Sequence, residues 1–163
     1  MYHAAVSASL GPTREDKCLI PGDEARPADL YIPMWGPGAR DWALDVCVTS
    51  PFQQATLERA AREPGYALAL KKQQKWSKYG ELCRAENIEF SALAVETSGG
   101  WEGDAEQIIT KISRSLARAI GQEESDMTRH LFGKLSVLLM RSNASMIINR
   151  TSIHPLSSTY GGL

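Results

Sequence analysis

Residues 28–49, with the sequence ADLYIPMWGPGARDWALDVCVT, contain the pattern from which the central sheet of this chain is predicted. Within it, residues 28–33 and 42–49 alternate large apolar side chains with small or polar ones, which is the pattern of a half-buried β-strand. The sequence Trp35-Gly-Pro-Gly38 lies between them and is rich in residues that form turns. We therefore expect the two strands to form a hairpin.

Four segments outside the hairpin space their apolar residues as helices do: 2–9, 66–86, 104–120 and 125–148. Residues 53–62 have room for a helical turn or two before Glu63-Pro-Gly65 ends it. Trp76, Tyr79 and Cys83 fall on one apolar stripe. The apolar residues of segment 131–148 are expected to be mostly core, and any surplus left exposed would favour a homodimer.

Two further strands are predicted. Residues 15–20 read as a short strand, and residues 87–97 form an almost continuous apolar run, typical of a strand buried on both faces in the middle of a sheet. The order of elements predicts an α/β or α+β fold, in which a central mixed sheet is flanked by helices, with extra helices at the C-terminus. We expect residues 1–150 to form one domain and residues 151–163 a flexible tail.

The composition is ordinary for a soluble globular protein. Of 163 residues, 43% are hydrophobic and 23% are charged, which excludes wholesale disorder. No stretch approaches the ~20 apolar residues of a membrane-spanning helix, because Arg141 interrupts the longest run, and the N-terminus lacks the pattern of a secretory signal. Cys18, Cys47 and Cys83 are too few and too widely spaced for a disulfide framework or a structural zinc site, so a reducing compartment is expected. The net charge of −1 argues against a protein that coats nucleic acid.

Two acidic residues lie in the middle of the predicted hairpin strands, where a carboxylate is costly to bury without a partner. If the hairpin pairs Asp29 with Asp45, both side chains project from one face and repel each other unless a divalent cation bridges them. Mg²⁺ is the natural candidate, because it takes one or two carboxylates and keeps waters for phosphate oxygens; we expect Mn²⁺ to substitute. The alternative is that one aspartate caps a turn while the other faces water or an arginine such as Arg26 or Arg40.

The predicted helix of residues 66–86 carries four lysines: Lys71, Lys72, Lys75 and Lys78. Lys75 lies at the border of the apolar stripe, where its stem can pack on the core while its ammonium reaches the edge of a site. Beside a phosphate and a metal-bound water, that ammonium would orient the nucleophile and offset developing negative charge. A solvated helix face explains Lys71, Lys72 and Lys78 equally well.

Three pieces of the sequence resemble one nuclease family: RPADL at residues 26–30, ALDV at 43–46, and the run from Phe90 that ends in LAVETSGGW at Trp101. Over residues 12–150 the chain is similar to the restriction-enzyme-like endonuclease domains that follow the reverse transcriptase in some non-LTR retrotransposons. The resemblance implies a PD-(D/E)XK core in which Asp29 is the first acid and Asp45 the second.

The resemblance also implies roles for other side chains. The usual pattern has a lysine two positions after the second acid, where this chain has Cys47; retrotransposon members commonly supply the lysine from the next helix, and Lys75 best matches that position. Glu96 is a further candidate for the catalytic site, with a turn-capping role as the alternative. The side chains expected to contact the DNA backbone are Arg26, Lys71, Lys72 and Lys78.

These observations lead to a metal-dependent DNA endonuclease that nicks its target by hydrolysing a phosphodiester bond. The alternative is a catalytically inactive nuclease-fold domain that acts in DNA binding or dimerisation, and a nuclease for branched DNA is a third option. A homodimer would suit a nuclease that acts on two strands. The chain is expected to act inside the cell, in the nucleus ahead of the cytoplasm, away from membranes, either alone or as part of a larger reverse-transcriptase polyprotein.

Overall fold

A computed structural model describes residues 1–14, 19–20 and 27–152 of the chain. Ten helices and strands are described, in the order α1 (Tyr2–Ser7), β1 (Thr13–Arg14), β2 (Leu30–Ile32), the 3₁₀ turn η1 (Pro37–Ala39), β3 (Asp41–Thr49), α2 (Leu57–Ala60), α3 (Tyr66–Ala85), β4 (Ile88–Glu96), α4 (Gly103–Ile120) and α5 (Glu124–Ser152). The fold is α/β, with helices packed on a four-stranded mixed sheet. The helices and the hairpin expected from the sequence are present within a few residues of their predicted bounds.

The strands lie in the order β1-β2-β3-β4. β2 runs antiparallel to β3 with Leu30 opposite Leu44, which is the register that the predicted hairpin required. β3 and β4 are parallel and pair over their full length, from Asp41 opposite Ile88 to Thr49 opposite Glu96. The long β3 is therefore the interior strand that joins the hairpin to the parallel pair.

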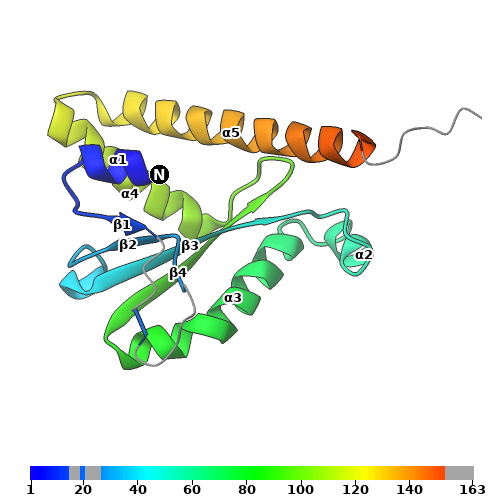
Figure 1. Cartoon of the computed structure of the whole chain (residues 1–163), viewed down its shortest axis with the longest axis horizontal. Coiled ribbons are helices and arrows are strands. Elements are labelled where there is room, and N and C mark those ends of the chain that lie inside the picture. The colour runs from blue at the N-terminus through cyan, green and yellow to red at the C-terminus, as the bar shows by residue number, and fades with distance from the viewer. Residues whose placement is uncertain (15–18, 21–26, 153–163) are drawn as a thin grey trace, which may run out of the picture.

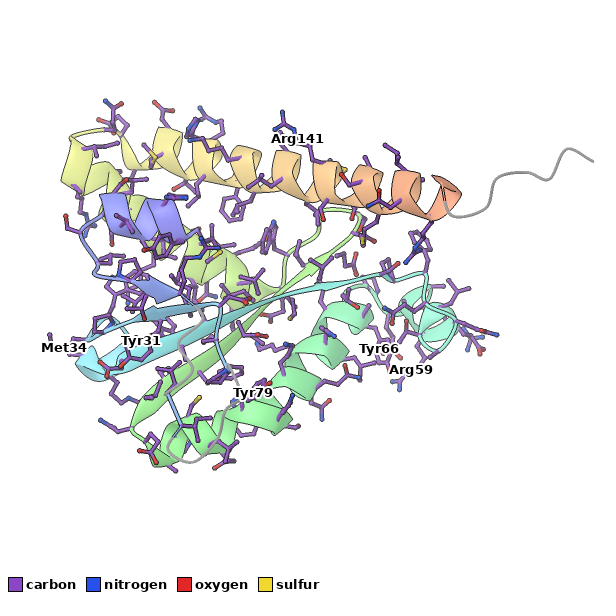
Figure 2. The ribbon with its side chains drawn as sticks, viewed as in Figure 1. Tyr31, Met34, Arg59, Tyr66, Tyr79 and Arg141 are labelled. Atoms are coloured by element: carbon purple, nitrogen blue, oxygen red, sulfur yellow. The ribbon has the colours of Figure 1, made fainter. Side chains whose placement is uncertain are left out.

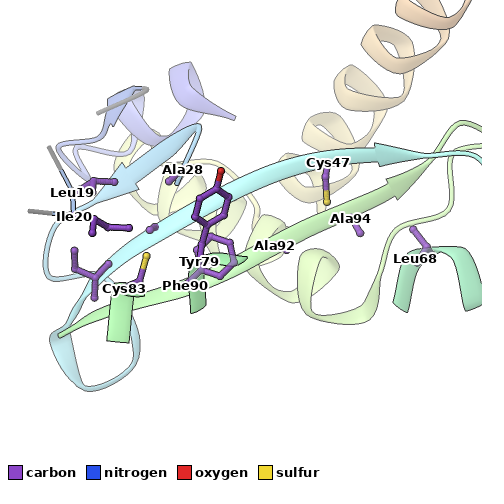
Figure 3. Close-up of a cluster of buried hydrophobic side chains, with 12 residues drawn as sticks. Leu19, Ile20, Ala28, Cys47, Leu68, Tyr79, Cys83, Phe90, Ala92 and Ala94 are labelled. Atoms are coloured by element: carbon purple, nitrogen blue, oxygen red, sulfur yellow. The ribbon is translucent and has the colours of Figure 1, made fainter. Parts of the chain in front are cut away.

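Helices cover the sheet on both faces (Figure 1). α3 packs against one face, where Cys47, Tyr79, Cys83 and Phe90 belong to one buried cluster (Figure 3). The opposite face is covered by α4, together with α1 and the first turns of α5; its buried cluster includes Leu44. This arrangement follows from strand periodicity, since successive side chains of β3 point alternately toward α3 and α4.

α4 shows how the sequence sets the bounds of a helix. The Glu102 side chain precedes it and accepts a hydrogen bond from the Asp104 N–H, which satisfies one of the free donors at the helix start. Gly121 ends it with φ of 68°, a conformation that glycine adopts without strain. Ile109 and Ile112 on its inner face are fully buried.

Two predictions about strands were wrong in part. β4 is buried on both faces, as expected, but among the described residues it lies at the edge of the sheet and not in the middle. Its sequence is apolar because α3 covers one of its faces and α4 the other. The number of strands beside it has no effect on this pattern. The strand expected at 15–20 falls largely outside the described residues, and Leu19 and Ile20 form a bend.

The prediction that segment 131–148 is mostly core was wrong. Leu131 is buried, but Val137, Leu138 and Ile147 are at least half exposed. α5 is one helix that packs on α4 with its first turns, and its later turns extend beyond α4 (Figure 1). Contrary to the expectation from the sequence that no segment could span a membrane, α5 is long and apolar enough to cross one by length and composition alone, and 6% of its most apolar window is buried. Helices that pack against other helices reach the same length and composition.

Trp76 differs from its expected burial, and so does Ile120, which helical spacing places on the same face of segment 104–120 as Ile108, Ile109 and Ile112. Trp76 was predicted to share the buried stripe of α3, but it is 40% exposed and its indole lies over Gly80, where an added Cβ would come within 2.7 Å of the ring. Ile120 is 48% exposed at the end of α4. Both residues lie at the margin of a helix face, where helical spacing does not separate core from surface.

Candidate active site

Asp45 and Lys75 meet between β3 and α3. Strand alternation turns Ala43, Asp45 and Cys47 toward α3, and the Asp45 side chain is only 7% exposed. The Lys75 Nζ donates a hydrogen bond of 3.1 Å to Asp45 Oδ1 and lies 3.0 Å from Oδ2. The predicted helical lysine therefore reaches the second of the two predicted acids.

Asp29 reaches the same region from the other strand of the hairpin. Its N–H donates to the Leu44 carbonyl at 3.0 Å, and its Oδ2 accepts a 2.8 Å hydrogen bond from the Val46 N–H. β2 begins at Leu30, opposite Leu44, whereas β3 continues past Leu44 to Thr49. The Asp29 carboxylate therefore accepts the Val46 N–H, which a main-chain carbonyl would accept if β2 extended further. Asp29 is exposed, and its negative charge acts on Asp45.

Burial raises the pKa of Asp45 above the usual value of an aspartate. The hydrogen bond and the charge of Lys75 act in the opposite direction, the charge of Asp29 raises the pKa further, and Lys71 lowers it by a smaller amount. Because burial prevails over the lysines, Asp45 holds its negative charge at a cost in free energy. Such a carboxylate gains from an additional cation.

Lys75 is protonated in this arrangement. Burial acts to lower the pKa of its ammonium, but the hydrogen bond and the charge of Asp45 outweigh burial, so the pKa is raised. The ammonium also lies 5.9 Å from the centre of the Tyr79 ring, one helical turn further along α3. Lys75 is thus a fixed positive charge and cannot act as a base.

The residues present fit a magnesium ion. Asp45 Oδ2 is buried and accepts no hydrogen bond from a described residue, since its contact with Lys75 is an ion pair without hydrogen-bond geometry. Mg²⁺ is held by one or two carboxylates and otherwise by waters and substrate phosphates, so Asp45 with Asp29 suffices. A site made of protein ligands alone is not available, because the described residues contain no group of three or more His, Cys, Asp or Glu able to hold a metal.

Cys47 lies on the α3 side of β3, two residues after Asp45. Burial, followed by the negative charge of Asp45, raises the pKa of its thiol to about 11. A thiol with this pKa is protonated at neutral pH and is a poor nucleophile. Cys47 therefore fills the position where a lysine was expected from the resemblance, and the ammonium near Asp45 comes from α3 instead.

The other lysines of α3 have separate environments. Lys72 forms ion pairs with Glu102, at 3.0 Å, and with Asp104, so it joins α3 to the start of α4. Lys78 is exposed, with its Nζ 4.7 Å from the centre of the Tyr79 ring. Lys71 is half-buried and close enough to act electrostatically on Asp45. The structure thus leaves Lys71 and Lys78 available for an anionic ligand, whereas the charge of Lys72 is compensated.

Glu96 is separate from the aspartate pair. The parallel register places Asp45 beside Ala92, four residues before Glu96, which corresponds to about 13 Å along the strand. The Glu96 carboxylate accepts a 2.9 Å hydrogen bond from the Ser98 hydroxyl, within the turn after β4. This is the turn-capping alternative of the sequence analysis. Arg26, expected to contact DNA, lies outside the described residues.

Sequence reasoning missed two contributors to this site. Tyr79, labelled in Figure 2, was assigned to the apolar stripe. Its ring also lies near the ammonium groups of Lys75 and Lys78, whose Nζ atoms are 5.9 Å and 4.7 Å from the ring centre. The Val46 main chain fixes the Asp29 carboxylate, which no side-chain pattern can reveal. The spacing of four residues between Lys75 and Tyr79 was the available signal for the first contact.

Three comparisons with known proteins were made, against family models, curated proteins and solved structures, and none of them gives a match.

Proposed function

We propose that this protein is a metal-dependent DNA endonuclease of the PD-(D/E)XK class, derived from a retroelement. The single observation that supports this most is the contact of Lys75 with a buried aspartate, Asp45, beside which a second aspartate is held by the Val46 N–H. Two acids from a hairpin and a lysine from the next helix are the groups that the family resemblance assigns to catalysis. The mixed sheet with flanking helices agrees with the expected architecture.

The proposed reaction is hydrolysis of a phosphodiester. Water oxygen forms a bond to phosphorus, the bond from phosphorus to one sugar oxygen breaks, and the proton released by the water ends on solvent or on the departing oxygen. Mg²⁺ held by Asp29 and Asp45, or Mn²⁺ in its place, would supply Lewis-acid activation and charge neutralisation. The Lys75 ammonium orients the attacking water and offsets the negative charge that develops on the phosphate oxygens.

The substrate strand is proposed to follow the lysines of α3. Lys71 and Lys78 precede and follow Lys75 by four and three residues, so the three share one side of the helix. Phosphate contacts of this kind fix the position of DNA without reading its sequence. Lys72 contributes less, because Glu102 and Asp104 compensate its charge. A contact from Arg26 remains a prediction.

Nicking of supercoiled plasmid tests the proposal. The wild-type protein is expected to convert it to open circles with Mg²⁺ or Mn²⁺ and not with EDTA, and Asp45→Asn and Lys75→Met are expected to lose this activity. Lys134→Met on α5 is the matched control, because it removes one exposed lysine on the other side of the sheet. Cleavage that survives Asp45→Asn would come from a contaminant and would contradict the proposal.

An inactive nuclease-fold domain that binds DNA or dimerises is the second candidate. The observation in its favour is that Lys75 already compensates part of the Asp45 charge without metal, while Cys47 occupies the usual lysine position. Under this alternative, no divalent cation would support nicking by the wild-type protein, although plasmid binding or self-association would persist.

A further inference from the structure

The Lys75 ammonium contacts both oxygens of the Asp45 carboxylate. Its Nζ donates to Oδ1 at 3.1 Å and lies 3.0 Å from Oδ2. Asp29, the other acid of the site, is held differently, because its Oδ2 accepts a hydrogen bond from the Val46 main chain. The backbone of β3 therefore fixes one acid of the pair, while a flexible side chain occupies the other.

A divalent cation cannot reach Asp45 while Lys75 keeps this position. The Asp45 side chain is 7% exposed and its Oδ2 is buried, whereas the Lys75 side chain is 29% exposed. Mg²⁺ keeps several of its waters when it binds a carboxylate, so it needs an open approach from solvent. It would also meet the positive charge of the ammonium at the same two oxygens. The ammonium and the metal ion are therefore alternatives at this carboxylate.

The contact that Lys75 would have to give up is a single one. Among the described residues its ammonium donates one hydrogen bond, to Asp45. Lys72, three residues earlier on α3, is held by two carboxylates at the start of α4. A lysine ammonium is carried on a flexible four-carbon stem, so it can exchange one anionic partner for another without a change in the backbone. Lys75 can therefore leave Asp45 while α3 stays in place.

We propose that Lys75 and the divalent cation compete for Asp45, and that a DNA phosphate ends the competition by binding the ammonium. This inference rests on the proposed function, in which Lys75 faces a phosphodiester. A phosphate oxygen accepts a charge-assisted hydrogen bond as a carboxylate does, so the ammonium exchanges one anion for the other. The carboxylate that it leaves is then open to the cation. Metal and DNA consequently bind with positive coupling, and each strengthens the binding of the other by the same factor.

The competition keeps the affinity for the cation low in the absence of DNA. A hydrogen bond to a charged group corresponds to about 10- to 100-fold in an equilibrium constant, and this factor is lost when the cation displaces Lys75. Lys71 provides an internal comparison, because its charge acts on Asp45 although it makes no hydrogen bond or ion pair with that residue. Direct competition and a general effect of positive charge therefore predict different results at Lys71 and Lys75.

Mn²⁺ binding to the whole chain without DNA tests the competition, and the EPR signal of free Mn²⁺ measures it. Lys75→Met is expected to bind Mn²⁺ about tenfold or more tightly than the wild type, although it is expected not to nick DNA. The matched control is Lys71→Met, which removes one positive charge near the same carboxylate and should strengthen binding by less than about threefold. Asp45→Asn should weaken binding. Circular dichroism verifies that each variant is folded.

DNA affinity with and without metal tests the coupling. The fluorescence anisotropy of a labelled short duplex, read before nicking begins, is compared in Mn²⁺ and in EDTA at constant ionic strength. The wild type is expected to bind the duplex about tenfold or more tightly in Mn²⁺. Lys75→Met should show a smaller increase, because its carboxylate is open to the metal whether or not DNA is bound. An equal increase for both proteins would overturn the role assigned to the phosphate.

The outcomes separate this inference from the proposed function. Equal Mn²⁺ affinity of the wild type and Lys75→Met, or an equal gain in Lys71→Met, would overturn the competition; metal-dependent nicking by the wild type would then still support the nuclease. Weaker Mn²⁺ binding by Lys75→Met would mean that the ammonium assists the cation, and would also overturn it. A chain that binds no Mn²⁺ in any variant would contradict the inference and the proposed function together.

Discussion

The Lys75 ammonium and the Asp45 carboxylate, thirty residues apart in the chain, meet at 3.0–3.1 Å across the space between α3 and β3. The contact partly offsets the cost of burying a carboxylate, but the pKa of Asp45 is raised nonetheless, because burial has the larger effect. A carboxylate kept in this condition is unfavourable for stability and suited to binding a cation. Activity is therefore expected to depend on Asp45 much more than stability does.

Replacing Asp45 with asparagine should separate these two properties. We expect nicking to fall by about 10²-fold or more, as when one preorganised electrostatic group is removed from an active site. The free energy of unfolding should change little, because removing the Asp45 charge relieves the cost of burying it but leaves Lys75, whose side chain is 29% exposed, without its ion-pair partner. Urea titration and plasmid nicking measure the two effects. A large loss of stability would mean that the ion pair is mainly structural.

Replacing Lys75 with methionine should impair catalysis much more than the same change at Lys78. Methionine keeps most of the packing of the lysine stem, so only the ammonium near Asp45 is lost. We expect about a 10²-fold decrease in nicking rate for Lys75→Met. For Lys78→Met, which removes an exposed charge, we expect weaker DNA binding whose salt dependence is shallower. Equal effects of both variants would contradict the assigned role of Lys75.

The pKa of Asp45 predicts how stability depends on pH in the absence of metal. A raised pKa means that the folded protein binds this proton more tightly than the unfolded chain. The contribution of Asp45 to stability is therefore greatest below its pKa and is lost as pH rises through it. Relative to Asp45→Asn, the wild type should become less stable from about pH 4 toward neutrality. Urea unfolding in EDTA measures this, and the opposite trend would show that Lys75 prevails over burial.

Leu131 and Leu138 should differ sharply in their effect on stability although both lie on α5. Leu131 is 5% exposed and belongs to the core beneath α4, so Leu131→Ala is expected to cost about 2–4 kcal/mol. Leu138 is 59% exposed, and Leu138→Ala should change the unfolding free energy of the monomer by less than about 0.5 kcal/mol. Chemical denaturation at low protein concentration measures both. Similar losses would mean that the later turns of α5 are buried in the monomer.

The thiols of Cys47 and Cys83 should be unreactive in the folded protein. Burial raises the pKa of each to about 11, and both lie in the cluster between α3 and the sheet. In a Cys18→Ser background, we expect a thiol reagent at neutral pH to modify neither residue until denaturant is added. Rapid modification of Cys47 in the folded protein would contradict this prediction and would be consistent with a nucleophilic thiol.

The sequence predicted the hairpin, and alternation limits its register to pairings that bury the same face of both strands, of which the observed pairing of Leu30 with Leu44 is one. A slip of one residue would have turned Leu44 toward α3 and Asp45 toward α4. The contact between Asp45 and Lys75 was also predictable, because alternation directs Asp45 to the face of the sheet that the next helix covers. The resemblance then selected Lys75 out of the four lysines of that helix. The exposed position of Asp29, and its capture by the Val46 N–H, depend on where β2 begins, which the pattern does not specify.

The position of β4 in the sheet, the packing side of α5 and the ion pairs of Lys72 could not be predicted. They depend on contacts between elements that are distant in the sequence. The apolar run of β4 indicates that helices cover both of its faces, but it does not indicate how many strands pair with its edges. α5 has apolar residues around most of its circumference, so periodicity does not identify the side that faces α4. Lys72 pairs with Glu102 and Asp104, which lie at the start of α4, 30 and 32 residues further along the chain.

The parallel pairing of β3 with β4 has a consequence for how the protein is made. α3 packs mainly on β4, which follows it in the chain, so Lys75 is not held near Asp45 until β4 has been synthesised and has docked beside β3. A nascent chain that has left the ribosome only as far as α3 carries both residues without the assembled pair. Under the proposed function, cleavage competence arises late in translation, and fragments ending before residue 88 are harmless to nucleic acid.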